Sequence, residues 1–292
     1  MTIERVVFDC GGDRLVGDLH LPSGSAPHPG TIVGGPMTSV KEQVTGTYAA
    51  ALARQGVAAL AIDHRYYGES GGTPRQYEYY PHKIADLRAA IDVLKSHKAI
   101  DADRIAATGI CLGCGYVAHA IGERADIKGF AAIAGYYRDV SAMKASDPEG
   151  FAEKVEQGRA ARVRYEATGN AEMIPAVALD RDAAMTLQST YDYYAGRAAH
   201  PNYANAFAVM SREHFLQFDV QAAASGITMP FLMAHSPNAL SPGWAQDFYA
   251  KVPGPKREIE ITARDQTDIY DNPAIVASVS GEVVRFFDAR FS

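Results

Sequence analysis

The chain has 292 residues, of which 47% are hydrophobic and 21% are charged, a balance typical of a folded globular protein rather than a disordered one. Its formal net charge of -6 gives no electrostatic reason to expect nucleic acid or an anionic membrane as a partner. The sequence has no apolar run long enough to span a bilayer, and its first residues lack the apolar segment of a secretory signal. We therefore expect a cytoplasmic protein.

Strand and helix patterns alternate along the first part of the chain. Two alternating runs, Arg5–Cys10 and Arg14–Leu21, flank a Gly-Gly-Asp turn and predict a β-hairpin. The segments that follow are strand Thr31–Gly34, helix Lys41–Gln55, strand Val57–Asp63, helix Lys83–His97, strand Arg104–Ile110, helix Leu112–Gly122 and strand Ile127–Ala134. This alternation with short connections predicts an α/β fold with a mostly parallel, doubly wound sheet.

The pattern changes at Tyr136. Residues 136–226 are rich in Ala, Arg, Tyr and acidic residues, and they predict helices and loops without a clear apolar strand. The alternation then resumes with strand Met229–His235, helix Gly243–Lys251, strand Arg257–Thr262 and helix Ala274–Ala289. We expect one core from residues 1–135 and 227–292, a helical cap from residues 136–226, and a pocket between them. Such caps can also mediate dimerisation, so a homodimer is one expectation.

The segment from Gly109 to Gly113 reads G-I-C-L-G and joins a predicted strand to a predicted helix. A nucleophile elbow needs this order, with small residues two positions before and after the nucleophile, because the backbone is crowded there. The spacing predicts Cys111 as a nucleophile whose acidity is raised by the helix N-terminus. A small buried cysteine at a glycine-rich helix start is the structural alternative.

Cys111 and Cys114 also form a CxxC pair, a pattern found in zinc and redox sites. Zinc would need two more ligands, and the sequence has no second CxxC and no HxxxH. The flanking glycines favour the elbow, with Cys114 packed against the sheet. The sequence also has no dinucleotide fingerprint and no P-loop, so we expect neither a cofactor nor a metal.

An elbow of this kind works with two backbone amides that stabilise an oxyanion. Leu112 follows the elbow residue and supplies the first amide. The second is expected from the glycine-rich segment before Met37. Since Pro36 has no N–H group, Met37 is the predicted donor. A simple tight turn would also explain these glycines.

Several stretches spread over nearly the whole chain resemble one group of enzymes. These are Gly35–Gln43, the D-x-R-x-x-G-x-S-G-G pattern of Asp63–Gly72, the G-I-C elbow, the R-A-A-H-P segment Arg197–Pro201 and the D-I-Y-D segment Asp268–Asp271. Together they resemble the α/β-hydrolases of the dienelactone-hydrolase-like group and their fungal polyketide-transferase-like relatives. The resemblance implies an α/β-hydrolase fold with a cap, acting on a small acyl compound such as an ester, lactone or thioester.

The chain departs from this group at the centre of its chemistry. In the group, a histidine lies two residues before the aspartate that begins the D-I-Y-D-like segment. Here that position is Gln266, and no histidine follows His235. The loop Ser236–Ala239, where the acid of the triad usually lies, has no carboxylate. A neutral glutamine cannot accept the thiol proton, so the usual proton relay is broken.

Three hypotheses remain open. In the first, a hydrolase or acyl transferase uses a rearranged triad, in which His235 is the base and Asp268 or Asp265 is the acid. A strand-end histidine bonded to the backbone is the structural alternative for His235. In the second, a cyclase, lyase or isomerase uses the oxyanion hole without a histidine, with Gln266 near the reacting atoms. In the third, the chain is a non-catalytic binding protein.

Aromatic residues gather near the predicted pocket and favour a small-molecule substrate that is bulky, planar or polyketide-like. Packing within the cap is the structural alternative. The predicted substrate-binding residues are Tyr66, Tyr136, Tyr137 and His200.

Overall fold

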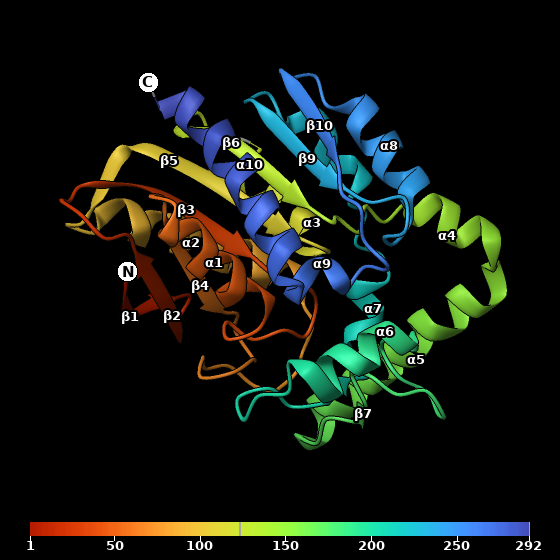
Figure 1. Cartoon of the computed structure of the whole chain (residues 1–292). Coiled ribbons are helices and arrows are strands. Elements are labelled where there is room, and N and C mark those ends of the chain that lie inside the picture. The colour runs from red at the N-terminus through yellow and green to blue at the C-terminus, as the bar shows by residue number, and fades with distance from the viewer. Residues whose placement is uncertain (123, 292) are drawn as a thin grey trace.

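The structure, a computed structural model, describes residues 1–122 and 124–291 and is built around one sheet of eight strands (Figure 1). The strand order is β1-β2-β4-β3-β5-β6-β9-β10. The strands are β1 (Thr2–Cys10), β2 (Asp13–Leu21), β3 (His28–Gly34), β4 (Ala58–Asp63), β5 (Ile100–Ile110), β6 (Ile127–Ile133), β9 (Phe231–His235) and β10 (Lys256–Glu260). The pairs β1·β2 and β2·β4 are antiparallel, and the others are parallel. The predicted α/β-hydrolase fold class is confirmed.

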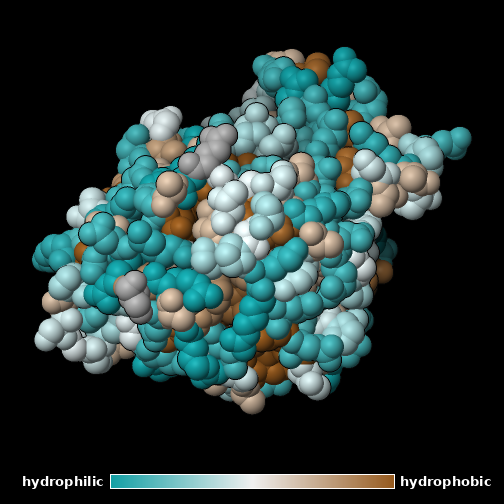
Figure 2. Space-filling view, turned by 90° about the horizontal axis from the view of Figure 1, so that it is seen from above, coloured by the Kyte–Doolittle hydropathy of each residue, from teal (hydrophilic) through white to brown (hydrophobic). Residues whose placement is uncertain are grey.

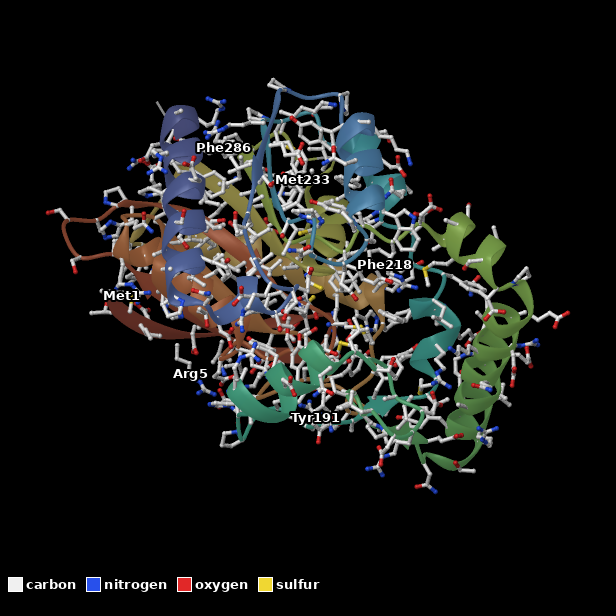
Figure 3. The ribbon with its side chains drawn as sticks, turned by 45° about the vertical axis from the view of Figure 1, so that its right-hand side comes forward. Met1, Arg5, Tyr191, Phe218, Met233 and Phe286 are labelled. Carbon is white, nitrogen blue, oxygen red and sulfur yellow. The ribbon has the colours of Figure 1, made fainter. Side chains whose placement is uncertain are left out.

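Helices cover both faces of this sheet (Figure 1). They are α1 (Val44–Arg54), α2 (Tyr80–Ser96), α3 (Gly113–Ile121), α8 (Pro242–Lys251), α9 (Asp268–Asp271) and α10 (Pro273–Phe291). Helix α1 packs against α10, and α2 packs against α3. The core holds Met233 of β9 and Phe286 of α10, labelled in Figure 3. Because both faces are covered, β4 is buried along its whole length, which explains its continuous apolar run.

Residues 136–226, here called the insertion, lie between β6 and β9. Their elements are α4 (Val140–Ser146), α5 (Pro148–Thr168), β7 (Met173–Ile174), α6 (Gln188–Tyr191), the π-helical turn η1 (Asp192–Arg197), β8 (Phe207–Ala208), α7 (Ser211–Phe215) and the 3-10 helix η2 (Gln221–Gly226). Figure 1 shows α5 running outside the sheet. The short antiparallel pair β7·β8 was not predicted, because two-residue strands are too short to show an alternating pattern.

Helix α1 begins at Val44, three residues later than the predicted start at Lys41. The intervening residues form a turn held by side chains. The amide of Lys41 donates to Asp63 Oδ1 at 2.8 Å, and the amide of Val40 donates to Gln43 Oε1 at 3.1 Å. These bonds satisfy the amides of Val40 and Lys41 outside the helix, so the loop before α1 keeps its own shape.

None of the helices in the described ranges is long and apolar enough to cross a membrane. On the face shown in Figure 2, hydrophobic residues form small groups separated by hydrophilic ones.

Candidate active site

Cys111 lies in a sharp turn between β5 and α3, at the carboxyl edge of the parallel strands. Its φ is 56°, a left-handed conformation that costs a non-glycine residue about 1–3 kcal/mol. The turn is fixed from both sides. The amide of Cys111 donates to the carbonyl of Ile133 at 3.1 Å, and its own carbonyl accepts from the amide of Tyr136 at 3.1 Å. The structure thus places Cys111 at the tip of a strained elbow, where the spacing predicts it.

Glycine is required at positions 109 and 113 because there is no space for a side chain. A Cβ atom at Gly113 would lie 2.3 Å from the carbonyl oxygen of Gly34, and one at Gly109 would lie 2.6 Å from Cys114 Cα. Both clashes are with backbone, which cannot move away as a flexible side chain can. The G-x-C-x-G spacing therefore follows from the close approach of β3, β5 and α3.

The loop Gly35–Val40, here called the oxyanion loop, lies beside the elbow. The hydroxyl of Ser39 donates to the carbonyl of Pro36 at 3.0 Å. In a trans peptide the C=O and N–H groups point in opposite directions, so this bond also sets the direction of the Met37 N–H. No acceptor within the described ranges takes that N–H. Met37, Leu112 and Cys111 all line one cavity, so the structure brings the predicted oxyanion donors to the elbow residue.

This cavity, here called the main cavity, has a volume of about 280 Å³ and lies between the core and the insertion. Its walls are mostly apolar. The lining residues are Pro36, Met37, Cys111, Leu112, Tyr136, Arg138, Met143, Ala184, Met185, Thr186, Leu187, Thr190, Tyr194, Phe215, Leu216, Leu240 and Tyr270. Such a space suits a small, largely apolar group with a few polar contacts.

Cys111 is 6% exposed, and burial raises the pKa of its thiol. Contacts with the hydroxyl of Tyr270, the amide of Leu112 and the side chain of Gln266 lower the pKa in turn, but by less than burial raises it. The sequence led us to expect a thiol made more acidic by the helix N-terminus. The amide of Leu112 does lower the pKa as expected, but the cost of desolvating a thiolate is larger, so the pKa of Cys111 is raised overall.

Gln266 occupies the position where the resemblance expects histidine. Its Nε2 donates to the carbonyl of Ala134 at 2.6 Å and to the hydroxyl of Tyr270 at 3.1 Å. Its Oε1 accepts from the amide of Leu240 at 3.0 Å. The amide therefore ties three chain segments together beside Cys111. It contributes hydrogen bonds at this position, but no base.

His235 lies at the end of β9 but faces a different cavity, of about 310 Å³, next to Ser236 and Glu258. Its ring packs near that of Tyr137, with 6.2 Å between centroids. Neither ring nitrogen has a hydrogen-bond partner within the described ranges, and burial lowers its pKa to about 4. The structure does not bring His235 to Cys111.

Asp268 is also used elsewhere. Its carboxylate accepts from the side chain of Arg264 at 2.7 Å and from Asn272 at 3.2 Å, and the guanidinium lowers its pKa to about 2. Asp265 accepts from the amides of Thr267 and Asp268. Both carboxylates thus stabilise the start of α9, and neither contacts His235.

Of the four predicted substrate-binding residues, only Tyr136 lines the main cavity. The hydroxyl of Tyr66 bonds His82 Nδ1 at 2.5 Å in a separate cluster. Tyr137 stacks on Phe248 of α8, with 4.5 Å between centroids. His200 accepts from the amide of Asn202 at the surface. Consecutive residues point in different directions, which separates Tyr137 from Tyr136.

Among the polar residues of the main cavity that sequence reasoning missed are Tyr270 and Arg138. Tyr270 belongs to a recognised segment but was given no role, although its hydroxyl contacts Cys111. Arg138 is 1% exposed and donates to the carbonyls of Phe215 at 2.8 Å and Leu216 at 3.1 Å, joining the start of the insertion to the end of α7. Its place directly after the aromatic pair that follows β6 could have drawn attention to it.

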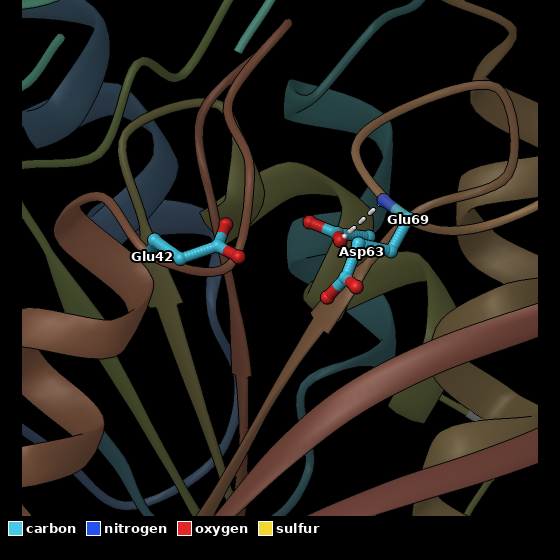
Figure 4. A group of neighbouring side chains, drawn as sticks. All are labelled: Glu42, Asp63 and Glu69. Carbon is cyan, nitrogen blue, oxygen red and sulfur yellow. Dashed lines mark hydrogen bonds between the residues drawn. The ribbon is translucent and has the colours of Figure 1, made fainter. Parts of the chain in front are cut away.

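Three carboxylates, those of Glu42, Asp63 and Glu69, converge with oxygen atoms within 4.8 Å of one another (Figure 4). Lys41 fills the space that a metal ion would need. Its Nζ lies 2.5 Å from Glu42, 3.2 Å from Asp63 and 2.6 Å from Glu69, and its pKa is raised by these carboxylates. We therefore assign the cluster to holding the end of the oxyanion loop rather than to metal binding.

Comparisons with known proteins agree with this fold. YcjY, an uncharacterized protein of Escherichia coli K12, is 30% identical over 268 residues, which cover 87% of this chain and 86% of YcjY. The crystal structure of the hypothetical protein PA2218 of Pseudomonas aeruginosa superposes with a TM-score of 0.86 at 25% identity, covering 99% of this chain and 94% of PA2218.

A third similarity is local. The thiohydrolase aneE of Aspergillus aculeatus is 36% identical over 109 residues, which are 37% of this chain and 33% of aneE. The family model described as serine aminopeptidase, S33, matches residues 41–264, a span that includes the elbow, the insertion and Arg264. The chain therefore belongs to the serine aminopeptidase S33 family of α/β-hydrolases.

Proposed function

We propose that the protein is an acyl hydrolase or acyl transferase that uses Cys111 as its nucleophile and acts on small, largely apolar acyl thioesters. One observation carries the proposal: Cys111 lines an apolar cavity together with Leu112 and Met37, whose amides are the predicted oxyanion donors. A carbonyl oxygen directed at these amides would be stabilised as negative charge develops on it. The cavity volume of about 280 Å³ fits a short acyl chain.

None of the described residues that line the main cavity is a histidine or a carboxylate, and without such a base a thioester is favoured over an ester. The sulfur of Cys111 attacks the acyl carbon, and the bond from that carbon to the leaving sulfur breaks. Cys111 reacts as its thiolate after losing the proton to solvent, and the leaving thiolate takes up a proton from solvent, so one thioester forms as another breaks without a base from the protein. An alkoxide leaving group would need protonation by an acid, and Gln266 cannot supply a proton in that way. The similarity to aneE, a thiohydrolase, supports the same class of substrate.

The second step decides between hydrolysis and transfer. Water attacking the acyl-Cys111 carbon would release the free acid and return a proton to the sulfur. This step needs a base to activate water, whereas an incoming thiol ionises in solution and attacks as its thiolate. We therefore expect slow hydrolysis and faster transfer of the acyl group to an added thiol.

The test is intact-protein mass spectrometry with a series of short acyl thioesters and the matching ethyl esters. We expect an acyl adduct on Cys111 from the thioesters, and its loss in Cys111→Ala. Cys114→Ala is the matched control, because Cys114 lies behind the elbow and bonds the carbonyl of Ile133. Equal turnover by Cys111→Ala and the wild type would refute the proposal.

A second candidate is a reaction without acyl transfer, such as an isomerisation or cyclisation through an enolate. The observation in its favour is that neutral hydrogen-bonding groups, the amide of Gln266 and the hydroxyl of Tyr270, surround the elbow. Such groups can stabilise negative charge on a substrate without activating water. Full turnover by Cys111→Ala, combined with loss of turnover in Tyr270→Phe, would favour this candidate over the first.

A further inference from the structure

A buried carboxylate lies behind the oxyanion loop. Glu78, two residues before α2, is fully buried. Its Oε2 accepts from the hydroxyl of Tyr67 at 2.6 Å and from the amide of Thr38 at 3.0 Å. Its Oε1 accepts from the hydroxyl of Tyr116 at 2.7 Å and lies 2.6 Å from Lys83 Nζ. Four groups from four separate segments thus meet at one carboxylate.

This carboxylate remains charged despite its burial. Lys83, which is also buried, and the two tyrosine hydroxyls lower the pKa of Glu78. A buried ion pair contributes little net stability, because desolvation of both charges offsets their attraction. None of these residues is among those that line the main cavity. Glu78 therefore contributes little net stability to the fold. Because it does not line the main cavity, it cannot contact a substrate in that cavity.

The amide that Glu78 accepts from belongs to the residue after the predicted oxyanion donor. Thr38 has a φ of 60°, a left-handed conformation that a threonine adopts only when its surroundings impose it. A hydrogen bond from its amide to a carboxylate is a strong restraint of this kind. The peptide on the other side of Met37 is held by Ser39 through the carbonyl of Pro36. Both peptides that flank Met37 are therefore fixed.

Glu78 also contacts the element that carries the other oxyanion donor. Tyr116 lies on α3, which begins immediately after Leu112, and its hydroxyl bonds the same carboxylate. One rigid group is therefore linked to the oxyanion loop on one side and to the elbow helix on the other.

We propose that Glu78 is a positioning residue for the oxyanion hole, whose carboxylate fixes the amides of Met37 and Leu112 at the spacing that a developing oxyanion needs. This inference rests on the proposed acyl-transfer function. Glu78 would affect the rate of acyl transfer rather than substrate binding, because the oxyanion forms only in the transition state.

The first test compares wild type with Glu78→Gln, which keeps the shape of the side chain but removes its charge. We expect kcat for transfer of a short acyl thioester to fall by roughly 10²-fold, the typical effect of losing one oxyanion donor, while KM changes little. Alkylation of Cys111 by iodoacetamide forms no oxyanion, so its rate should stay within about twofold of wild type. General damage to the site would slow both reactions.

The matched control is Asp86→Asn. Asp86 is another buried carboxylate with a cationic partner, Arg65 at 2.8 Å, but it has no hydrogen bond to the oxyanion loop. The Asp86→Asn variant should have a lower melting temperature, as Glu78→Gln should, but its kcat should stay within about threefold of wild type. Equal losses of kcat in both variants would overturn the proposal.

If Glu78→Gln does not fold, Tyr67→Phe decides the question, since it removes one of the four partners and no charge. We expect a loss in kcat of roughly 3- to 10-fold, with alkylation unchanged. An unchanged kcat in this variant, or in a folded Glu78→Gln, would refute the role of Glu78. Failure of the wild type to form an acyl adduct on Cys111 would instead refute the proposed function itself.

Discussion

The side-chain amide of Gln266 donates to the carbonyl of Ala134 at 2.6 Å, directly beside the elbow that carries Cys111. Ala134 follows β6, and its φ of 47° marks a second strained turn next to that of Cys111. The glutamine thus joins the loop after β10 to the end of β6. The position where a histidine could transfer a proton is therefore occupied by Gln266, whose hydrogen bonds join two chain segments.

Replacing Gln266 by histidine should create a base beside Cys111. We expect water to attack the acyl-Cys111 adduct faster by roughly 10²-fold, the lower end of what general base catalysis provides, because no carboxylate orients the new imidazole. Single-turnover release of the free acid measures this step. The control is Gln266→Asn, which keeps an amide and adds no base. A deacylation rate equal in the two variants would contradict the prediction.

Replacing Tyr270 by phenylalanine should make Cys111 less reactive. The hydroxyl of Tyr270 lowers the pKa of the thiol, so its removal should raise that pKa further and reduce the thiolate fraction at pH 8. We expect iodoacetamide to alkylate Cys111 about threefold more slowly at this pH, with the pH–rate curve moved to higher pH. Tyr136→Phe is the control, because Tyr136 lines the same cavity. A larger effect in the control would count against the assignment.

Replacing His235 by glutamine should reduce the dependence of stability on pH. The folded-state pKa of His235 is about 4, below its ordinary value of 6.5. Between these values the unfolded chain binds a proton that the folded chain does not, so stability falls as the pH falls from 6.5 towards 4. From pH 7 to 4.5, wild type should lose about 2–3 kcal/mol more than the variant in urea unfolding.

The same variant tests the rearranged triad. Because His235 faces a separate cavity, His235→Gln should form the acyl adduct on Cys111 at close to the wild-type rate at pH 7.5. Loss of acylation in a folded variant would restore His235 as the base.

Replacing Gly113 by alanine should destabilise the protein strongly. The added Cβ would lie 2.3 Å from the carbonyl oxygen of Gly34, and neither backbone can move without distorting the elbow. We expect a loss of about 3 kcal/mol or more in the free energy of unfolding. Gly243→Ala is the control, because its Cβ would meet nothing within 4 Å, and it should be neutral or slightly stabilising. Similar effects in both variants would show that crowding is not the cause.

The sequence predicted the fold well where local pattern and burial act together. β4 reads as a continuous apolar run because both its faces are covered, and the turn around Cys111 needs glycines at two fixed positions. The start of α1 could not be predicted in this way. It depends on the bond from Lys41 to Asp63, a residue 22 positions away that belongs to another strand.

The same limit applies to the site. The elbow and the two predicted oxyanion amides lie within or next to the short glycine-containing patterns that indicate them, so they could be predicted. The placement of His235 could not, because being at the end of a strand does not settle which face of the sheet a side chain takes. The roles of Tyr270 and Glu78 arise from contacts between distant segments, and no short motif contains them.

The burial of Cys111 has a consequence for its tolerance of oxidants. Peroxides and general electrophiles react with thiolates, and the raised pKa keeps this sulfur protonated at neutral pH. A carbonyl compound that reaches the two amides would be activated in place, whereas hydrogen peroxide gains nothing from them. We therefore expect Cys111 to react more slowly with oxidants than an exposed, acidic cysteine does.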